Sequence, residues 1–135
     1  MKAIVILLIL MQIVLFMQQL DAYCIYNKTN KRFLDLHQTS YHTKAPLLSL
    51  FQKHVAPESR ECCPYTSPDC SMSGAKDEIV VVTIQTAKYF CYSISLPAGG
   101  WVNVMDPRNN LGADILDFEV FSSDGTPFEY ERLAP

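Results

Sequence analysis

The placement of its cysteines is the feature that most constrains how this 135-residue chain can fold. Three of the five, Cys62, Cys63 and Cys70, fall within the ten residues "ECCPYTSPDC", and the others are Cys24 and Cys91. Two adjacent cysteines cannot easily face one metal ion, because zinc sites use pairs of ligands at short spacing that recur elsewhere. A Cys-x-x-Cys redox motif is also absent from the sequence. The pattern therefore favours disulfide bonds.

The turn-forming residues of "PYTSPD" predict a small loop closed by a disulfide between Cys63 and Cys70. Cys91 alternates with the large apolar residues of its predicted strand, so it should point away from the core. Its partner must then lie on a neighbouring strand or an overlying loop, and we expect either Cys24 or Cys62. The remaining cysteine would be a free thiol. We expect a monomer, although a free thiol leaves a disulfide-linked dimer open.

The first 22 residues have the layout of a secretory signal peptide. Lys2 supplies a positive start, an apolar run interrupted only at Gln12 follows, and a polar stretch ends at Ala22. The apolar run is shorter than the roughly 20 residues that span a bilayer. We therefore expect cleavage after Ala22, no stable membrane insertion, and a secreted extracellular domain comprising residues 23–135.

Apolar and polar residues alternate repeatedly between frequent turns, which indicates an all-β domain. The predicted strands lie at 23–27, 32–38, 78–85, 89–96, 101–105, 115–121 and 128–133, and an eighth could lie at 46–51 if that segment does not form one or two helical turns. The first two strands should form a hairpin, and Asp124-Gly125 should join the last two in another. Segment 78–85 should be a central strand because it is apolar on both faces. We predict a single antiparallel, disulfide-stapled β-sandwich of about seven or eight strands, with one short helix allowed.

Charge and histidine spacing exclude some classes of function. The formal net charge of −3 argues against binding nucleic acid or an anionic membrane through bulk electrostatics. His37, His42 and His54 have no cysteine or carboxylate at ligand spacing, and segment 106–114 lacks the regular acidic spacing of a calcium loop. We predict no metal site and no cofactor.

Two sets of residues leave a small extracellular hydrolase open as the main alternative. Carboxylates at every second position of the last two predicted strands could form a glycosidase-like pair, although a solvated face is the simpler explanation. A second set includes the residue types of a small secreted ribonuclease. The first set is Asp117, Glu119, Glu129 and Glu131, and the second is His37, His42, Glu129 and Arg132. A membrane-active toxin is a further alternative, and it would need an exposed aromatic belt.

Without a convincing catalytic group, binding through the loops at one end of the sandwich is the function we expect. Trp101 follows a Gly-Gly turn and could be held at the surface for contact with sugar or protein, although burial in the core competes with this. Arg108, Asn109 and Asn110 in the following polar loop are the other candidate binding residues. Asn27 begins the sequon "NKT", which predicts a glycoprotein.

The segments "IYNKT", "ECCPYTSPDC", "IVVVTI", "SLPAGGWVNV" and "FSSDGTPFEY" occur here in this order. The combination resembles small secreted cysteine-containing proteins of fungi, which occur among predicted effector-like secretomes. It runs over most of residues 23–135, and its sharpest parts are the cysteine cluster and "PAGGW". This resemblance implies a compact β-sandwich and no established activity. We therefore expect a non-enzymatic, effector-like protein that binds an extracellular protein or glycan.

Overall fold

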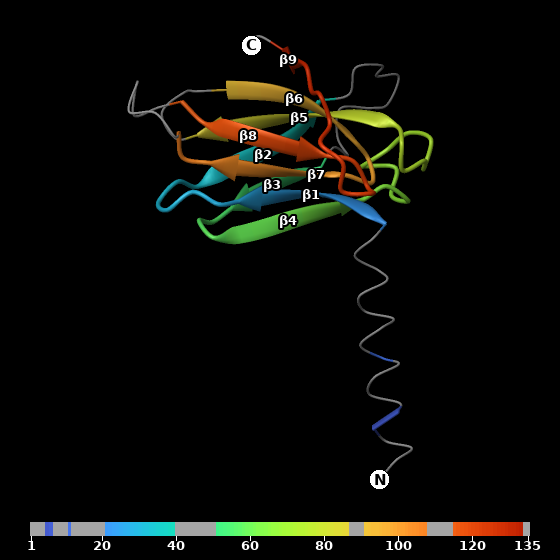
Figure 1. Ribbon diagram of the computed structural model, residues 1–135. Coiled ribbons are helices and arrows are strands. Elements are labelled where there is room, and N and C mark those ends of the chain that lie inside the picture. The colour runs from blue at the N-terminus through green and yellow to red at the C-terminus, as the bar shows by residue number, and fades with distance from the viewer. Residues whose placement is uncertain are drawn as a thin grey trace.

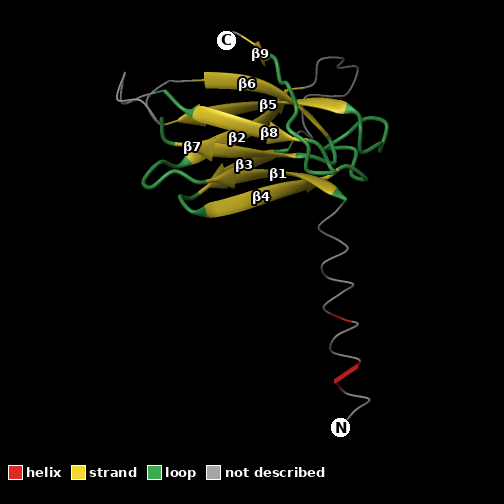
Figure 2. Ribbon diagram, in the orientation of Figure 1, coloured by secondary structure: helices red, strands yellow, loops and turns green. Residues whose placement is uncertain are grey.

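The computed structural model describes residues 5–6, 11, 21–39, 51–86, 91–107 and 115–133. The strands are β1 (Ala22–Asn27), β2 (Leu34–Thr39), β3 (Gln52–Val55), β4 (Ser59–Pro64), β5 (Ile79–Thr86), β6 (Cys91–Pro97), β7 (Trp101–Met105), β8 (Asp117–Phe121) and β9 (Arg132–Leu133). They form two sheets that lie face to face (Figures 1 and 2). The predicted all-β sandwich is therefore confirmed.

The two sheets have the strand orders β4-β1-β7-β8 and β3-β2-β5-β6-β9. Every pair of neighbours is antiparallel except β1 and β7, which run parallel, so the prediction of a purely antiparallel sandwich was wrong at this one pair. Segment 78–85 corresponds closely to β5, and β5 lies between β2 and β6 as expected for a central strand. The predicted helical turns at 46–51 fall, except for Phe51, outside the described residues.

The core lies between the sheets because alternate residues of each strand point inward. On β6 the buried side chains of Tyr92, Ile94 and Leu96 alternate with half-buried Cys91, Ser93 and Ser95. The same alternation on β7 and β8 buries Val102, Val104, Phe118 and Val120. Each strand therefore leaves its other residues for one of two outer faces, and these faces are where a partner can bind.

The first predicted hairpin was wrong in its pairing, and the second forms only next to its turn, where Phe121 and Pro127 make an antiparallel bridge. β1 and β2 follow one another in the chain but belong to different sheets. The turn of Ser122–Thr126 does form, with Gly125 at φ 86° and the Ser122 N–H donating to the Thr126 carbonyl. Beyond Phe128, however, the chain leaves β8, and β9 pairs with β6 of the other sheet. Local turn residues form the bend but do not decide which strand the outgoing chain joins.

Two disulfides staple the sandwich, and their pattern follows from strand geometry. Adjacent residues of a strand point to opposite faces, so Cys62 bonds to Cys24, its direct neighbour across the β4–β1 pair, on the outside. Cys63 points inward, is buried, and bonds to Cys70 as predicted. The expected bridge from Cys91 was wrong, because Cys91 is a free thiol. It does point outward, but it lies in the sheet that contains neither Cys24 nor Cys62.

A carboxylate holds the chain that follows the Cys63–Cys70 loop. Glu78 accepts hydrogen bonds from the hydroxyls of Ser71 and Ser73 and from the N–H groups of Met72 and Ser73. Partial burial by itself would raise the pKa of Glu78, but these hydrogen bonds outweigh it and lower the pKa to about 2. The ionised side chain therefore connects this loop to the start of β5.

Cleavage after Ala22 stays a prediction. Ala22 is the first residue of β1, and the preceding Asp21 accepts a hydrogen bond from the Tyr65 hydroxyl at 2.6 Å. Processing at this position would remove both residues from their contacts. In the described part of the chain, no helix is long and apolar enough to cross a membrane.

Candidate functional site: the outer face of the four-stranded sheet

The outer face of the four-stranded sheet gathers most of the half-buried aromatic side chains of the strands. We call it the aromatic face, and define it by the residues of β1, β4, β7 and β8 that alternate with the core. They are Cys24, Tyr26, Arg60, Cys62, Trp101, Asn103, Met105, Asp117, Glu119 and Phe121. Large apolar rings that remain partly in contact with water are a common mark of a binding surface.

Trp101 and Phe121 form the aromatic centre of this face. They are direct neighbours across β7 and β8, and their rings stack with centroids 5.1 Å apart at an interplanar angle of 18°. Gly100 makes this approach possible, because a Cβ atom there would lie 2.2 Å from the Phe121 carbonyl oxygen. Both rings are half-buried, so their free surface remains accessible to a ligand. Trp101 is therefore half-buried on a sheet face, and the alternative of a position in the core was wrong.

A second row crosses the same face next to the stacked rings. Arg60, Tyr26, Asn103 and Glu119 follow one another across β4, β1, β7 and β8. The Arg60 guanidinium donates a hydrogen bond to the Tyr26 hydroxyl at 3.3 Å, and its Cζ lies 5.7 Å from the centre of the Tyr26 ring. Asn103 is 7% exposed, and its side chain has no hydrogen-bond partner among the described residues. The row combines an aromatic ring with groups that can bind hydroxyls and charges.

Charge is divided across the aromatic face. The cations Lys28 and Arg60 lie on the β1 and β4 side, and the carboxylates Asp117 and Glu119 lie on β8. A groove of about 360 Å³ lies beside Tyr26 on the first side, and a pocket of about 330 Å³ lies beside Phe118 on the second. A partner covering the whole face would therefore meet positive charge at one edge and negative charge at the other.

The outer face of the five-stranded sheet has a different composition. Between β5 and β6 it presents short polar side chains, and the Thr83 and Ser93 hydroxyls lie 3.0 Å apart. At its edge His54 Nδ1 lies 2.6 Å from an Asp35 carboxylate oxygen, and the exposed Phe33 ring stacks on the imidazole at 5.0 Å. We call this the hydroxyl face. Its rings are confined to the β2–β3 edge.

The predicted end loops are placed only in part. Trp101 begins β7, as the predicted strand 101–105 requires, and its side chain lies on a sheet face at the end of the Gly99-Gly100 turn. Arg108, Asn109 and Asn110 lie outside the described residues. Cys24 and Tyr26 are two residues apart on one strand, so their side chains point to the same face, and this could have indicated that Tyr26 points outward. No sequence pattern placed Tyr26 close to Trp101.

Asn27 is buried, and this argues against the predicted sugar. Its side chain is 1% exposed, and Nδ2, the atom that would carry the glycan, donates to the carbonyls of Arg32, Val55 and Ala56 at 2.8–3.1 Å. The Thr29 N–H and hydroxyl in turn donate to Asn27 Oδ1. A sugar on Nδ2 would displace these contacts, so this fold and a glycan on Asn27 exclude one another. The sequon instead ties the end of β1 to the residues after β3.

The residues considered for catalysis come from separate segments of the described structure. Asp117 and Glu119 lie on β8, whereas Glu129 and Glu131 are exposed in the segment that leaves β8 for the other sheet. His37 lies on β2, Glu129 and Arg132 follow the Gly125 turn, and His42 lies outside the described residues. Among the residues that the structure describes, no three His, Cys, Asp or Glu side chains lie together as a metal site.

Cys91 also lacks a catalytic setting. It shares the hydroxyl face with the His54–Asp35 pair, but the register places Gln85 beside Cys91 and Asp35 beyond Gln85. Two strand spacings, about 10 Å, therefore separate the thiol from the carboxylate. A thiol must lie within hydrogen-bond reach of its base to be activated.

Comparison of the chain with protein-family models, with curated protein sequences and with solved structures finds no match.

Proposed function

We propose that the protein is a secreted, non-enzymatic binding protein that contacts extracellular glycans through the aromatic face. The observation that carries this proposal is the stacked pair of Trp101 and Phe121, flanked by Tyr26, on a solvent-facing sheet. The C–H faces of sugar rings pack against aromatic rings, while their hydroxyls need hydrogen-bonding groups at the margin. Asn103, Arg60 and Glu119 supply such groups beside the rings.

Secretion is supported by two independent features. The leader has the composition of a signal peptide, and the two disulfides are of the kind that persist in oxidising compartments. The biological setting that we propose is an effector-like role among the small cysteine-containing proteins that fungi secrete. Protein partners remain the alternative occupant of the same face, since stacked aromatic rings also anchor protein interfaces.

Binding of the oxidised protein to an array of neutral and acidic oligosaccharides tests this function. Trp101→Ala should lower the affinity for the best ligand about tenfold or more, because removing a central aromatic anchor costs about 2 kcal/mol of binding free energy. Phe33→Ala is the matched control, since Phe33 is 50% exposed but belongs to the hydroxyl face. Thermal midpoints of both variants would separate lost binding from lost folding. Equal affinity of Trp101→Ala and the parent protein would contradict the proposal.

Incubation of the protein with RNA and with polysaccharides tests the non-enzymatic part. We expect no release of acid-soluble nucleotides or reducing ends above the level of a heat-denatured sample. Release that disappears in a His54→Ala variant would instead establish a hydrolase. Dye leakage from liposomes would identify a membrane-active protein, and we expect none.

A further inference from the structure

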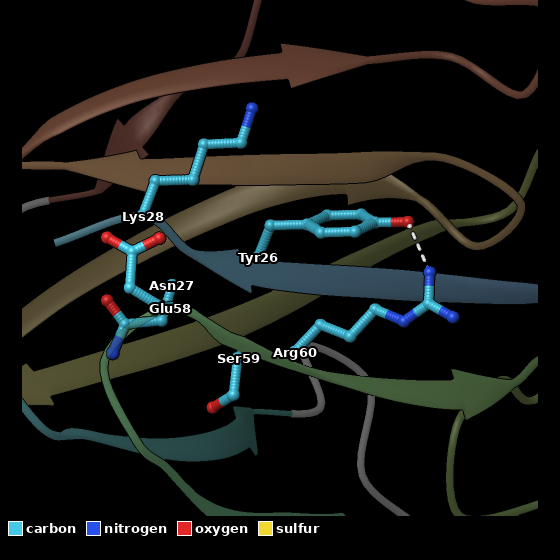
Figure 3. Close-up of a pocket in the computed structure, with 6 residues that line it drawn as sticks. All are labelled: Tyr26, Asn27, Lys28, Glu58, Ser59 and Arg60. Carbon is cyan, nitrogen blue, oxygen red and sulfur yellow. Dashed lines mark hydrogen bonds between the residues drawn. The ribbon is translucent and has the colours of Figure 1, made fainter.

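A groove at the β4 edge of the aromatic face has a composition suited to an anion. It has a volume of about 360 Å³ and is lined by Tyr26, Asn27, Lys28, Glu58, Ser59 and Arg60. Figure 3 shows the Tyr26 ring lying along the strand, with Arg60 at its hydroxyl end and Lys28 extending beyond its other end. β4 has only one neighbouring strand, so the groove opens at the margin of the sheet.

No residue that the structure describes forms an ion pair with either cation of this groove. In the described part of the chain the ion pairs are Arg32–Asp106 and His54–Asp35, neither of which includes Lys28 or Arg60. Arg60 uses one nitrogen on the Tyr26 hydroxyl, which leaves further N–H donors available. Glu58 contributes one carboxylate to the lining, so the groove carries two positive charges against one negative charge.

We propose that this groove binds the carboxylate or sulfate group of an acidic sugar whose ring lies against Tyr26. The inference rests on the proposed glycan binding, and it names the chemical class of the ligand. The guanidinium of Arg60 can donate two parallel hydrogen bonds to a planar carboxylate, and Lys28 adds a second charge. Tyr26 supplies both an apolar surface and a hydroxyl. The neighbouring Trp101–Phe121 pair would hold the next sugar of the chain.

Charge distribution favours a single acidic group over a broad anionic surface. The chain has a formal net charge of −3, and Asp117 and Glu119 occupy the opposite edge of the same face. A membrane rich in anionic lipids would meet these carboxylates as soon as it covered the face. A sugar with one acid group per ring can place that group between Lys28 and Arg60 and extend neutral hydroxyls elsewhere. The local cations therefore match an acidic glycan.

Calorimetry with a matched pair of ligands tests the inference. The pair is an oligosaccharide of uronic acids and its fully methyl-esterified form, which differ in charge and by one methyl group per ring. We expect the acidic form to bind about tenfold more tightly, with an affinity that falls as salt rises, since hydrogen bonds to charged groups are stronger than those to neutral groups and salt screens them. Arg60→Gln and Lys28→Gln should each lower the affinity for the acid far more than the affinity for the ester. Lys53→Gln, an exposed cation of β3 in the other sheet, is the control.

The outcomes separate this inference from the function on which it rests. If both ligands bind equally, or if Arg60→Gln leaves the preference for the acid intact, the groove is not the anion site. Equal losses in Lys53→Gln and Arg60→Gln would show non-specific charge attraction and would also overturn the inference. If Trp101→Ala weakens both ligands while Arg60→Gln affects neither, the glycan function stands and only the acidic specificity fails. Absence of binding to either ligand would refute both.

Discussion

The aromatic face and the hydroxyl face arise from the same alternation of residues but present opposite chemistry to solvent. On β5 and β6 the outward positions include Thr83, Ser93 and Ser95, whose hydroxyls water solvates at little cost, and the aliphatic Ile79 and Val81, but no aromatic ring among the described residues. On β7 and β8 the equivalent positions carry Trp101 and Phe121, which retain apolar area in water at about 25 cal/mol per Å². Folding stability by itself would therefore not favour aromatic rings at these outward positions of β7 and β8.

Under the proposed function, the hydroxyl face serves the fold and the aromatic face serves contact. The hydroxyl face belongs to the sheet that contains the central strand β5, and its polar residues keep that sheet hydrated. The aromatic face also carries the Cys24–Cys62 disulfide, which fixes β4 against β1 next to the Tyr26 and Arg60 pair. A rigid backbone under partly exposed rings is the arrangement that lowers the entropic cost of binding.

Removal of the Cys24–Cys62 disulfide should have the largest effect and should weaken the aromatic face first. The two cysteines are 38 residues apart, so the chain-entropy model predicts a loss of about 4 kcal/mol of unfolding free energy for a Cys24→Ser, Cys62→Ser double variant. The Cys63–Cys70 disulfide spans 7 residues, and its removal should cost about 2 kcal/mol. Urea unfolding of oxidised protein measures both losses.

Cys91→Ser is the control for these variants. Cys91 is a half-buried free thiol on the hydroxyl face, so we expect a change within about 0.5 kcal/mol. In the parent protein only Cys91 should react with a thiol label. A destabilisation as large as that of the Cys24 and Cys62 variant would mean that Cys91 is bridged.

Gly100→Ala should have the next largest effect, because it separates the two strands that carry the stacked rings. The new Cβ would lie 2.2 Å from the Phe121 carbonyl oxygen, so β7 must move away from β8. Overpacking of this kind costs about 1–3 kcal/mol, and we expect the upper end of that range. Gly99→Ala is the comparison, since the nearest atom at 2.9 Å is the Lys76 Cβ and the loss should be smaller. Thermal unfolding and Trp101 fluorescence would report stability and stacking; an unchanged Gly100→Ala protein would contradict the close approach.

The smallest effect concerns pH and the loop that leads into β5. Glu78 has a folded pKa of about 2 against an ordinary value of 4.5, so its stabilisation is complete above pH 4.5 and is lost as the pH falls towards 2. Because the side chain is largely solvated, we expect a contribution of only about 1 kcal/mol. The difference in unfolding free energy between parent and Glu78→Gln should therefore shrink between pH 5 and pH 2. A difference that stays constant over this range would exclude the ionised carboxylate as its cause.

Several features could be predicted from local sequence because their causes are local. The turn residues between Cys63 and Cys70 close a small loop, and the adjacency of Cys62 and Cys63 forces them to opposite faces of a strand. The β-branched run at 78–85 predicts a central strand, and β5 lies between β2 and β6. The alternation around Cys91 correctly placed its side chain outside the core.

The pairing of strands was decided only by the tertiary structure. Nothing near Cys24 indicates that β1 lies between β4 and a parallel β7, and this arrangement alone brings Cys24 opposite Cys62 and Tyr26 beside Asn103. The same long-range packing buries Asn27, whose sequon by itself suggests an exposed turn. The alternation of residues determines which face a side chain occupies, because it follows from backbone geometry within one strand. The alternation does not determine which strand becomes the neighbour, because the pairing of strands depends on how all the apolar surfaces are buried together.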